Sequence, residues 1–322
     1  MKKIVFPLIS GKSGADVYFE NIKECVKDCA DININYFKNI NQFLPFLIDT
    51  RYLNGDLFHC TNGEILWNLK DKKQSKIISI LHLTYEKGYK NHLSFAQRIY
   101  YNTLYKRYLK KSLPYADKII SISKYTQKKL KEEFDYDSEV IYPCIDTEMF
   151  KPNSKMDSNK IKILYSGNFS KRKGFDLLPK IMERLDNNFE LYCTGLRSQD
   201  KKFNRINYLG KLDKNGLIKA YNDSDIFLST SRLEGFGLSV AEAMSCGKPC
   251  VVTNCSSLPE LIDDKGGFLC ERDNVEDFVQ KIKILSDDKR LREEMGKYNR
   301  KKVISKFSFN ILRGKYLKLY DL

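Results

Sequence analysis

Residues 225–260 read DIFLSTSRLEGFGLSVAEAMSCGKPCVVTNCSSLPE, and this stretch predicts a β-loop-α-β unit. The apolar run 226–228 suits a buried strand, and a turn with two glycines follows it. Residues 238–244 then predict a short helix, because a glycine and a proline come directly after it. A second apolar run, 250–252, predicts another buried strand and completes the unit.

A glycine-rich turn that opens a helix suits a phosphate ligand, because the backbone can approach closely and the helix N-terminus favours negative charge. Glu234 precedes the predicted helix and Glu242 lies on it, with seven residues between them. Carboxylates accept hydrogen bonds from sugar hydroxyls, so the pair favours a nucleotide-sugar, whose hydroxyls flank a diphosphate. A tight turn beside a solvated helical glutamate is the alternative; it accounts for either glutamate alone but not for the joint pattern.

The same stretch resembles the signature of retaining glycosyltransferases of the family-4 type. The shared pattern is S-x-x-E-G-F-G-L-x-x-x-E-A-M-x-x-G-x-P-V, in which Cys250 stands where the family usually has valine. The resemblance implies an α/β protein of the GT-B fold, with two Rossmann-like doubly wound domains facing a cleft. It implies transfer of a hexosyl unit, with retention, from a nucleotide-diphosphate sugar to a glycan or lipid-linked glycan in cell-surface polysaccharide synthesis.

The length of 322 residues is consistent with two domains. The resemblance implies an acceptor-binding Rossmann-like domain over 1–150 and a nucleotide-sugar-binding one over 151–308. Residues 309–322 are expected to form a helix that crosses back to the N-terminal domain. The polar segment 151–160 is expected to link the two domains.

Composition indicates a cytoplasmic protein. The nine cysteines are scattered through apolar runs without the spacing of zinc sites, which favours buried free thiols in a reducing compartment. The apolar run near the N-terminus is too short for a signal peptide, and no run is long enough to span a membrane.

The net charge of +15 is concentrated in two stretches. Residues 84–131 carry twelve Lys or Arg against two acids, and residues 297–318 carry eight basic residues and no acid. Residues 93–111 predict a helix with one face made of Leu93, Ala96, Tyr100, Leu104 and Tyr108. A basic, aromatic-rich helix can lie on an anionic membrane surface, so peripheral contact with the inner face of the cytoplasmic membrane is one interpretation. An ordinary surface helix is the other.

The second half of the chain contains most of the expected donor-binding residues. Residues 166–174 resemble the family's G-R-x-x-x-x-K-G, in which Lys173 matches, Asn168 replaces the arginine and Arg172 lies close enough to compensate. In the roles implied by the resemblance, Glu242 accepts from the ribose and Glu234 from the sugar, and amides of the glycine turn meet sugar or phosphate. Residues 207–212 resemble the family loop whose backbone reads the nucleobase. The residues expected to bind the donor are Gly14, Arg172, Lys173, Gly210, Glu234, Gly235, Phe236, Gly237, Leu238 and Glu242.

The N-terminal half supplies two further expectations. Gly14, in a loop after the first predicted strand, is expected to face the donor phosphates, although Ala15 replaces the usual second glycine. His82 ends a predicted strand and corresponds to a family histidine beside the donor sugar, with His59 as a competing candidate. His82 and Glu234 are thus the predicted catalytic residues.

No metal and no other cofactor are expected. The D-x-D pattern at 223–225 falls at a helix-to-strand junction, and basic residues, amides and glycine loops would stabilise the leaving diphosphate instead. The donor is expected to be a UDP-sugar or a GDP-sugar, and no nucleic-acid motif is present. The alternatives are a GT-B epimerase acting on the nucleotide-sugar, and a non-catalytic basic protein that binds nucleic acid or membrane.

Overall fold

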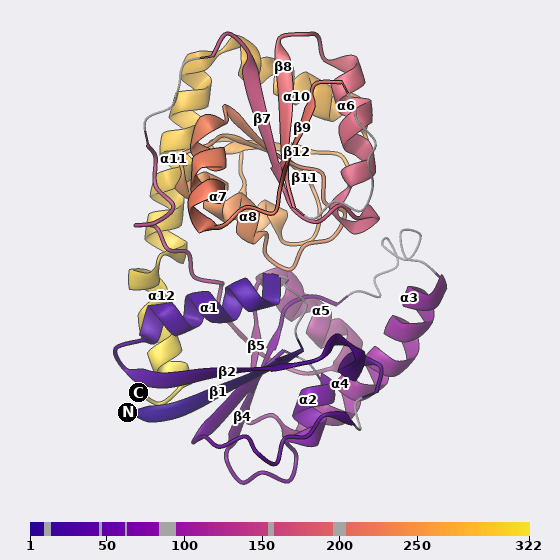
Figure 1. Ribbon diagram of the computed structural model, residues 1–322, viewed down its shortest axis with the longest axis vertical. Coiled ribbons are helices and arrows are strands. Elements are labelled where there is room, and N and C mark those ends of the chain that lie inside the picture. Colours follow the sequence, from indigo (N-terminus) through magenta and orange to yellow (C-terminus); the bar gives the residue numbers. More distant parts are fainter. Residues whose placement is uncertain (10–13, 45–46, 62, 84–94, 154–157, 196–203) are drawn as a thin grey trace. The chain divides into compact units, whose positions relative to one another are not determined.

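The structure, a computed structural model, describes the chain except residues 10–13, 45–46, 62, 84–94, 154–157 and 196–203. The described residues divide into two compact units, each an α/β domain (Figure 1). The first unit comprises Met1–Cys144 and Phe309–Leu322, and the second comprises Ile145–Ser308.

The division falls between Cys144 and Ile145, earlier than the expected boundary after Phe150. The described residues of the expected linker, 151–153 and 158–160, are grouped with the second unit. Arg300 explains part of this difference, because its guanidinium donates to the carbonyl oxygens of Thr147 and Phe150, each at 2.8 Å. These bonds attach the segment after Cys144 to the second unit.

The first unit contains a six-stranded parallel sheet in the order β2-β1-β3-β4-β5-β6. Its strands are β1 (Lys2–Ile9), β2 (Ala30–Phe37), β3 (Leu57–Cys60), β4 (Ser75–Ile80), β5 (Lys118–Ser121) and β6 (Glu139–Val140). Its helices are α1 (Gly14–Val26), α2 (Gly63–Asn68), α3 (Phe95–Tyr100), α4 (Lys106–Ser112), α5 (Lys124–Phe134) and α12 (Phe309–Leu319), with short turns η1 (Asn39–Gln42), η4 (Tyr101–Tyr105) and η5 (Leu113–Tyr115).

The second unit repeats this architecture with a six-stranded parallel sheet in the order β12-β11-β10-β7-β8-β9. Its strands are β7 (Ile161–Ser166), β8 (Phe189–Thr194), β9 (Ile206–Gly210), β10 (Ile226–Ser229), β11 (Cys250–Thr253) and β12 (Gly267–Cys270). Its helices are α6 (Leu178–Arg184), α7 (Lys214–Asp223), α8 (Leu238–Ser245), α9 (Leu258–Leu261), α10 (Val275–Asp287) and α11 (Lys289–Phe307), with turns η6 (Lys171–Lys173) and η7 (Phe175–Leu177).

The strand order of the second sheet places a topological switch point between β7 and β10. The chain runs outward from β7 through β8 to β9, and then returns to the other side of β7 with β10, β11 and β12. Ligands of open α/β sheets bind outside the carboxyl ends of the strands at such a point. The loops that follow β7 and β10 are therefore the expected ligand loops, and they carry Lys173 and Glu234.

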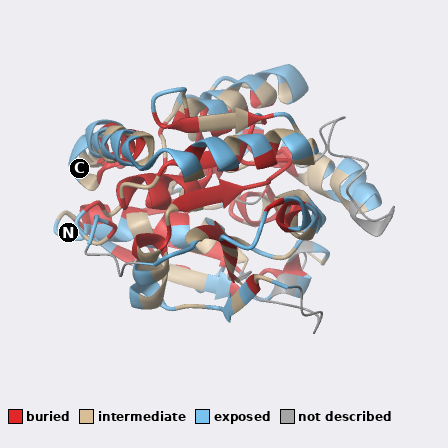
Figure 2. Ribbon diagram, turned by 90° about the horizontal axis from the view of Figure 1, so that it is seen from above, coloured by how far each residue is buried: buried red, intermediate tan, exposed pale blue. Residues whose placement is uncertain are grey.

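The inner strands of both sheets are largely buried, whereas the edge strands β2 and β9 carry exposed residues. Figure 2 shows buried strands between helices whose outer faces are exposed. Every residue of β10 and of β11 is buried, as expected for central strands of a parallel sheet with both faces covered. All nine cysteines are free and eight of them are buried, Cys29 being half-buried. The prediction of free thiols within the apolar core is confirmed for these eight.

Three aspartates attach the starts of neighbouring strands by one recurring arrangement. Asp56, Asp117 and Asp225 each directly precede a strand. Their carboxylates accept hydrogen bonds from the backbone N–H groups of Lys3, Lys76 and Lys162, at 2.8, 2.7 and 2.9 Å. Asp225 of the D-x-D pattern thus has a structural role, and the expected absence of a metal stays a prediction.

The single apolar face predicted for a helix over 93–111 is not found among the described residues; Leu93 and the side chain of Ala96 lie outside them. The described part consists of α3, the π-helical turn η4 and α4. The wider π turn breaks the 3.6-residue period. Leu104, expected on the same face as Tyr100, is instead 39% exposed, whereas Tyr100 points to a buried side chain of α2.

Candidate active site

The loops after β7 and β10 contact each other through their backbones. Gly174, which ends η6, has a φ of +65°, and a Cβ atom there would overlap the carbonyl oxygen of Thr230. The Thr230 hydroxyl donates to the carbonyl oxygens of Lys173 at 3.1 Å and Gly174 at 2.9 Å. Glycine is required at this position both for its positive φ and for this close approach.

This contact brings Lys173 and Glu234 together. Lys173 Nζ lies 2.5 Å from Glu234 Oε1, and the Ser231 hydroxyl donates to the same oxygen at 2.7 Å. Arg172 Nη1 lies 3.9 Å from the other carboxylate oxygen and donates to the carbonyl of Leu233 at 3.0 Å. The two basic residues predicted to hold a diphosphate therefore surround the glutamate predicted to bind the sugar.

The charges of Lys173, Arg172 and Glu234 determine whether the Lys173 and Glu234 side chains are ionised. Burial by itself raises the pKa of Glu234, but Lys173, Arg172 and the Ser231 hydroxyl outweigh it, and the net shift is downward. Burial lowers the pKa of Lys173, and Glu234 opposes that shift. Near neutral pH the pair is an ion pair, and the ammonium keeps further N–H donors for a phosphate oxygen.

The helix after the glycine turn begins without a side-chain cap. α8 starts after Gly237, which has a φ of +100° and no side chain that could accept from the first N–H groups of the helix. By contrast, α5, α7, α10 and α11 are capped by Ser123, Asp213, Asn274 and Asp288. An α-helix leaves its first N–H groups without intrahelical partners, so the start of α8 can bind an anion.

The side chain of Phe236 anchors the glycine turn. Its ring is buried and packs against Phe307, with 5.3 Å between the ring centroids. The side chain therefore anchors the turn in the core, and only the backbone of this residue can serve the ligand role predicted for it.

Glu242 is held by a tyrosine that sequence analysis did not identify. Glu242 lies on α8 and is buried, and Tyr221 of α7 donates its hydroxyl proton to Glu242 Oε2 at 2.7 Å. Burial raises the pKa of Glu242 to about 7, whereas the Tyr221 hydrogen bond and Lys214 oppose the rise. The sequence signal for Tyr221 is weak, because a tyrosine in an amphipathic helix is usually a packing residue.

A buried arginine supports the two loops. Arg232 donates to the carboxylate of Asp176 at 2.7 and 2.9 Å and to Asp273 at 2.6 Å, and it also binds the carbonyl of Lys171. Its backbone N–H donates to the carbonyl of Arg172 at 2.8 Å. Sequence analysis missed Arg232; the only signal was a charged residue inside an otherwise uncharged segment, 226–233.

The predicted residues of the N-terminal half lie in the first unit. Gly14 is the exposed first residue of α1, and part of the loop before it lies outside the described residues. His82 is half-buried and lies just after β4, where its carbonyl accepts from the Tyr105 hydroxyl at 3.5 Å. His82 and Glu234 thus belong to different units, and a joint catalytic role for them stays a prediction.

His59, the competing histidine, is a structural residue. It is fully buried within β3, and its ring nitrogens contact the hydroxyls of Tyr320 at 2.8 Å and Ser79 at 2.7 Å. Burial lowers the pKa of His59 to about 3, so the imidazole is neutral. The histidine serves to attach the end of the chain, which contains α12, to the first sheet.

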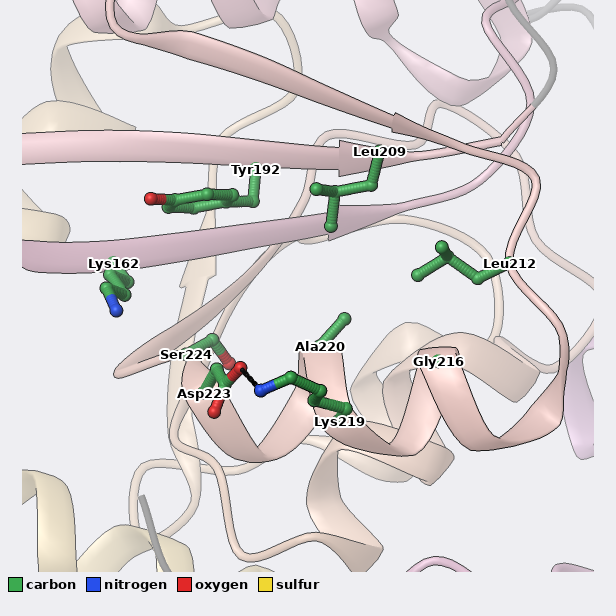
Figure 3. Close-up of a pocket in the computed structure, with 9 residues that line it drawn as sticks. All are labelled: Lys162, Tyr192, Leu209, Leu212, Gly216, Lys219, Ala220, Asp223 and Ser224. Carbon is green, nitrogen blue, oxygen red and sulfur yellow. Dashed lines mark hydrogen bonds and ion pairs between the residues drawn. The ribbon is translucent and has the colours of Figure 1, made fainter. Parts of the chain in front are cut away.

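Gly210 ends the edge strand β9, where a loop was expected, and has a φ of +70°. A cavity of about 270 Å³ lies beside it, between the sheet and α7 (Figure 3). Leu209 and Leu212, which flank Gly210, line this cavity together with Tyr192 and the stem of Lys162. The segment expected to read the nucleobase thus borders an apolar cavity, whereas the charged residues of the site lie elsewhere.

The two findings that bear on metals and membranes concern only the described residues. Among them, no three His, Cys, Asp or Glu side chains gather so as to hold a metal ion. In the same part of the chain, no helix combines the length and the apolar character needed to cross a membrane.

The two Rossmann-like units, with ligand loops at a switch point, define the chain as a two-domain α/β protein of the GT-B fold. Residues 146–302 match the family described as glycosyl transferases group 1, and residues 33–149 match the glycosyltransferase family 4 description. The chain belongs to the group 1 glycosyltransferases.

The individual relatives match only part of this chain. An uncharacterized glycosyltransferase of Methanocaldococcus jannaschii is 31% identical over 202 residues, or 60% of this chain and 56% of that protein. The N,N'-diacetylbacillosaminyl-diphospho-undecaprenol alpha-1,3-N-acetylgalactosaminyltransferase of Campylobacter jejuni is 35% identical over 117 residues, or 36% of this chain and 30% of that protein. The chain thus matches only about a third to a half of the length of these relatives.

The solved structure of HepE from Anabaena, in complex with UDP and glucose, superimposes with a TM-score of 0.81 at 16% identity and covers 100% of both chains. This likeness shows that the fold is shared.

Proposed function

We propose that the protein is a retaining glycosyltransferase that moves a hexosyl unit from a nucleotide-diphosphate sugar to a glycan or lipid-linked glycan acceptor. The observation that carries the proposal is the convergence of Lys173, Arg172 and Glu234 at the switch point of the second sheet. The names of the relatives agree with it: HepE was solved with UDP and glucose, and the Campylobacter enzyme is named for a diphospho-undecaprenol acceptor.

Each group has a distinct role in this proposal. The ammonium of Lys173, the guanidinium of Arg172 and the N–H groups at the start of α8 stabilise the negative charge that develops on the leaving diphosphate. Glu234 accepts from hydroxyls of the transferred sugar, and Glu242, oriented by Tyr221, accepts from the ribose. His82 of the first unit is the residue that we propose to contact the donor sugar. The acceptor hydroxyl attacks from the face that the diphosphate leaves, and a phosphate oxygen takes its proton.

The proposed reaction needs no metal and no cofactor, because fixed cations and amides perform the charge stabilisation. The role proposed for the protein is synthesis of cell-surface polysaccharide in the cytoplasm. A UDP-sugar or a GDP-sugar is the proposed donor.

A thermal-shift screen against UDP, GDP, ADP and their sugars tests this function. A ligand at about 100 times its dissociation constant is expected to stabilise the protein by roughly 2.7 kcal/mol, and one nucleotide series should do so. Glu242→Ala should abolish the shift, whereas Lys283→Ala on α10 should retain it. Stabilisation by no nucleotide, together with salt-sensitive RNA binding, would contradict the proposal.

Contact with an anionic membrane surface is the second part of the proposal. Ile99 and Leu104 are 49% and 39% exposed on the α3–α4 segment, next to the exposed basic residues Arg98, Arg107 and Lys110. Apolar side chains that can enter the headgroup layer beside basic residues suit a peripheral anchor.

Sedimentation with phosphatidylglycerol-containing vesicles measures this contact. A basic residue near an anionic surface is worth about 1 kcal/mol, so Arg107→Ala/Lys110→Ala should weaken binding roughly 30-fold. Lys283→Ala/Lys289→Ala removes two exposed basic residues of the second unit and serves as the control. Equal losses in both variants, or binding that does not depend on salt, would rule out a specific anchor.

A further inference from the structure

A buried carboxyl group in the first unit has no part in the donor site. Glu64 lies in the first turn of α2, shortly after β3, and its side chain is fully buried. Its Oε1 accepts a hydrogen bond from the Tyr100 hydroxyl at 3.2 Å. Its Oε2 is also buried and has no hydrogen-bond partner among the described residues. Buried polar atoms in native proteins are nearly always paired, so this oxygen is a candidate for a ligand contact.

Three aromatic rings lie next to the ring of Tyr100. The Tyr100 ring lies 4.8 Å from Phe43, 5.1 Å from Tyr101 and 6.4 Å from Tyr105, measured between ring centroids. We call these four residues the aromatic cluster. Phe43 is 45% exposed and the three tyrosines are half-buried, so the cluster extends from the surface to Glu64.

Two features of the backbone support a ligand site here. Tyr101 and Tyr105 lie at the two ends of the π-helical turn η4, and such turns are frequent at functional sites. β3 is one of the two strands at the switch point of the first sheet, and α2 follows its carboxyl end. Ligands of open α/β sheets bind beyond these strand ends.

A buried carboxyl group beside an aromatic cluster suits a carbohydrate ligand. Aromatic faces stack against the C–H faces of a sugar ring, while a carboxyl and a phenol exchange hydrogen bonds with its hydroxyls. We propose that Glu64, Tyr100 and the aromatic cluster form a carbohydrate site in the first unit, in which a sugar hydroxyl pairs with the unpartnered oxygen of Glu64. The assignment of a sugar as the ligand rests on the proposed glycosyltransferase function.

The electrostatics of Glu64 agree with this role. Burial raises the pKa of Glu64 to about 7, and hydrogen bonds from its own backbone N–H and from the Tyr100 hydroxyl only partly oppose the rise. Near neutral pH the carboxyl therefore exchanges between a form that donates and a form that only accepts, and a sugar hydroxyl can pair with either.

The single tryptophan of the chain provides a local probe. Trp67 lies on α2, the same short helix as Glu64, so its fluorescence should respond to a ligand at this site. The titrants are the methyl glycosides of glucose, galactose and N-acetylglucosamine, and, separately, UDP, GDP, UDP-glucose and GDP-mannose. A fluorescence response to a methyl glycoside would indicate that the site binds an acceptor sugar. A response to a nucleotide-sugar but not to its nucleotide reports the sugar of the donor.

The test compares Glu64→Gln and Tyr100→Phe with the wild-type protein. Either change should weaken the response roughly tenfold or more, because one hydrogen bond to a buried carboxyl group is lost or altered. Glu133→Gln makes the same substitution on an exposed glutamate of α5 that pairs with Lys106, and it should leave the response unchanged.

The outcomes separate this site from the donor site. Nucleotide-induced thermal stabilisation should persist in all three variants, which shows that each is folded. No fluorescence response to any sugar, or a response that Glu64→Gln and Tyr100→Phe leave unchanged, would overturn the carbohydrate site. Loss of the nucleotide shift in the wild-type protein would instead contradict the proposed function.

Discussion

Replacing Lys173 by methionine is expected to abolish sugar transfer and to lower the free energy of unfolding by about 3 kcal/mol at pH 7. The ammonium lies 2.5 Å from Glu234, whose side chain is 8% exposed, so its removal leaves a buried carboxylate without its closest cation. Arg172, at 3.9 Å, and the Ser231 hydroxyl remain, which keeps the loss at the lower end of the range for broken buried pairs. Chemical denaturation and a donor-consumption assay measure the two effects.

The double variant Lys173→Met/Glu234→Gln separates stability from function. With no buried charge left, it should regain most of the lost stability, because the cost lies in the unpaired carboxylate. It should not regain transfer, since the cation that stabilises the leaving diphosphate is still missing. A single Lys173→Met variant that is both stable and active would show that the ion pair has no role.

The effect of Lys173→Met on the free energy of unfolding should depend on pH. In the wild-type protein the pKa of Glu234 is lowered, so its contribution to stability is present above the unfolded pKa and is lost as the pH falls through the folded one. Without Lys173, burial dominates and the pKa of Glu234 should rise. The stability difference between Lys173→Met and wild type should therefore be small in acid and grow as the pH rises.

Glu242→Gln is expected to gain stability relative to wild type as the pH rises. Burial raises the pKa of Glu242 from its ordinary 4.5 to about 7, so between these pH values the native state binds a proton that the unfolded state has lost. The stability conferred by that proton is fully present below about pH 4.5 and is lost as the pH rises to about 7. The glutamine variant lacks this loss, so the stability difference should shift in its favour by roughly 2–3 kcal/mol between pH 4 and pH 8.

Tyr221→Phe is the matched comparison for this effect. The hydroxyl lowers the pKa of Glu242, so its removal should raise that pKa further and increase the loss of stability toward high pH. Both variants should bind the donor nucleotide more weakly, about tenfold for a lost hydrogen bond to a carboxylate. Parallel stability profiles for Glu242→Gln and wild type from pH 4 to pH 8 would show that Glu242 does not titrate as inferred.

Much of the second unit could be predicted from local sequence. The strand at 226–228, the helix from residue 238 and the strand at 250–252 match β10, α8 and β11, because apolar runs and glycine punctuation act over a few neighbouring residues. The glutamates at 234 and 242 and the basic loop at 172–173 could be selected for the same reason. The GT-B fold class, expected from the motif, is confirmed.

Other features required the tertiary structure. Residues 93–111 have a helical period in sequence, but the π turn η4 changes that period, and Tyr100 is bonded to Glu64, 36 residues away in sequence. The roles of His59 and His82 could not be told apart, since each belongs to or follows a strand and only burial separates them.

By itself, the sequence determined the fold class, the residues of the glycine turn and the chemical character of the ligand loops. Those properties depend on residue type and on short spacings along the chain. Only the tertiary structure decided that Lys173 pairs with Glu234, that Tyr221 holds Glu242 and that Glu64 is buried with one oxygen that no described residue pairs. These partners are 61, 21 and, for Glu64 and Tyr100, 36 residues apart in sequence. Contacts over such separations arise from strand order and helix packing, which no local pattern encodes.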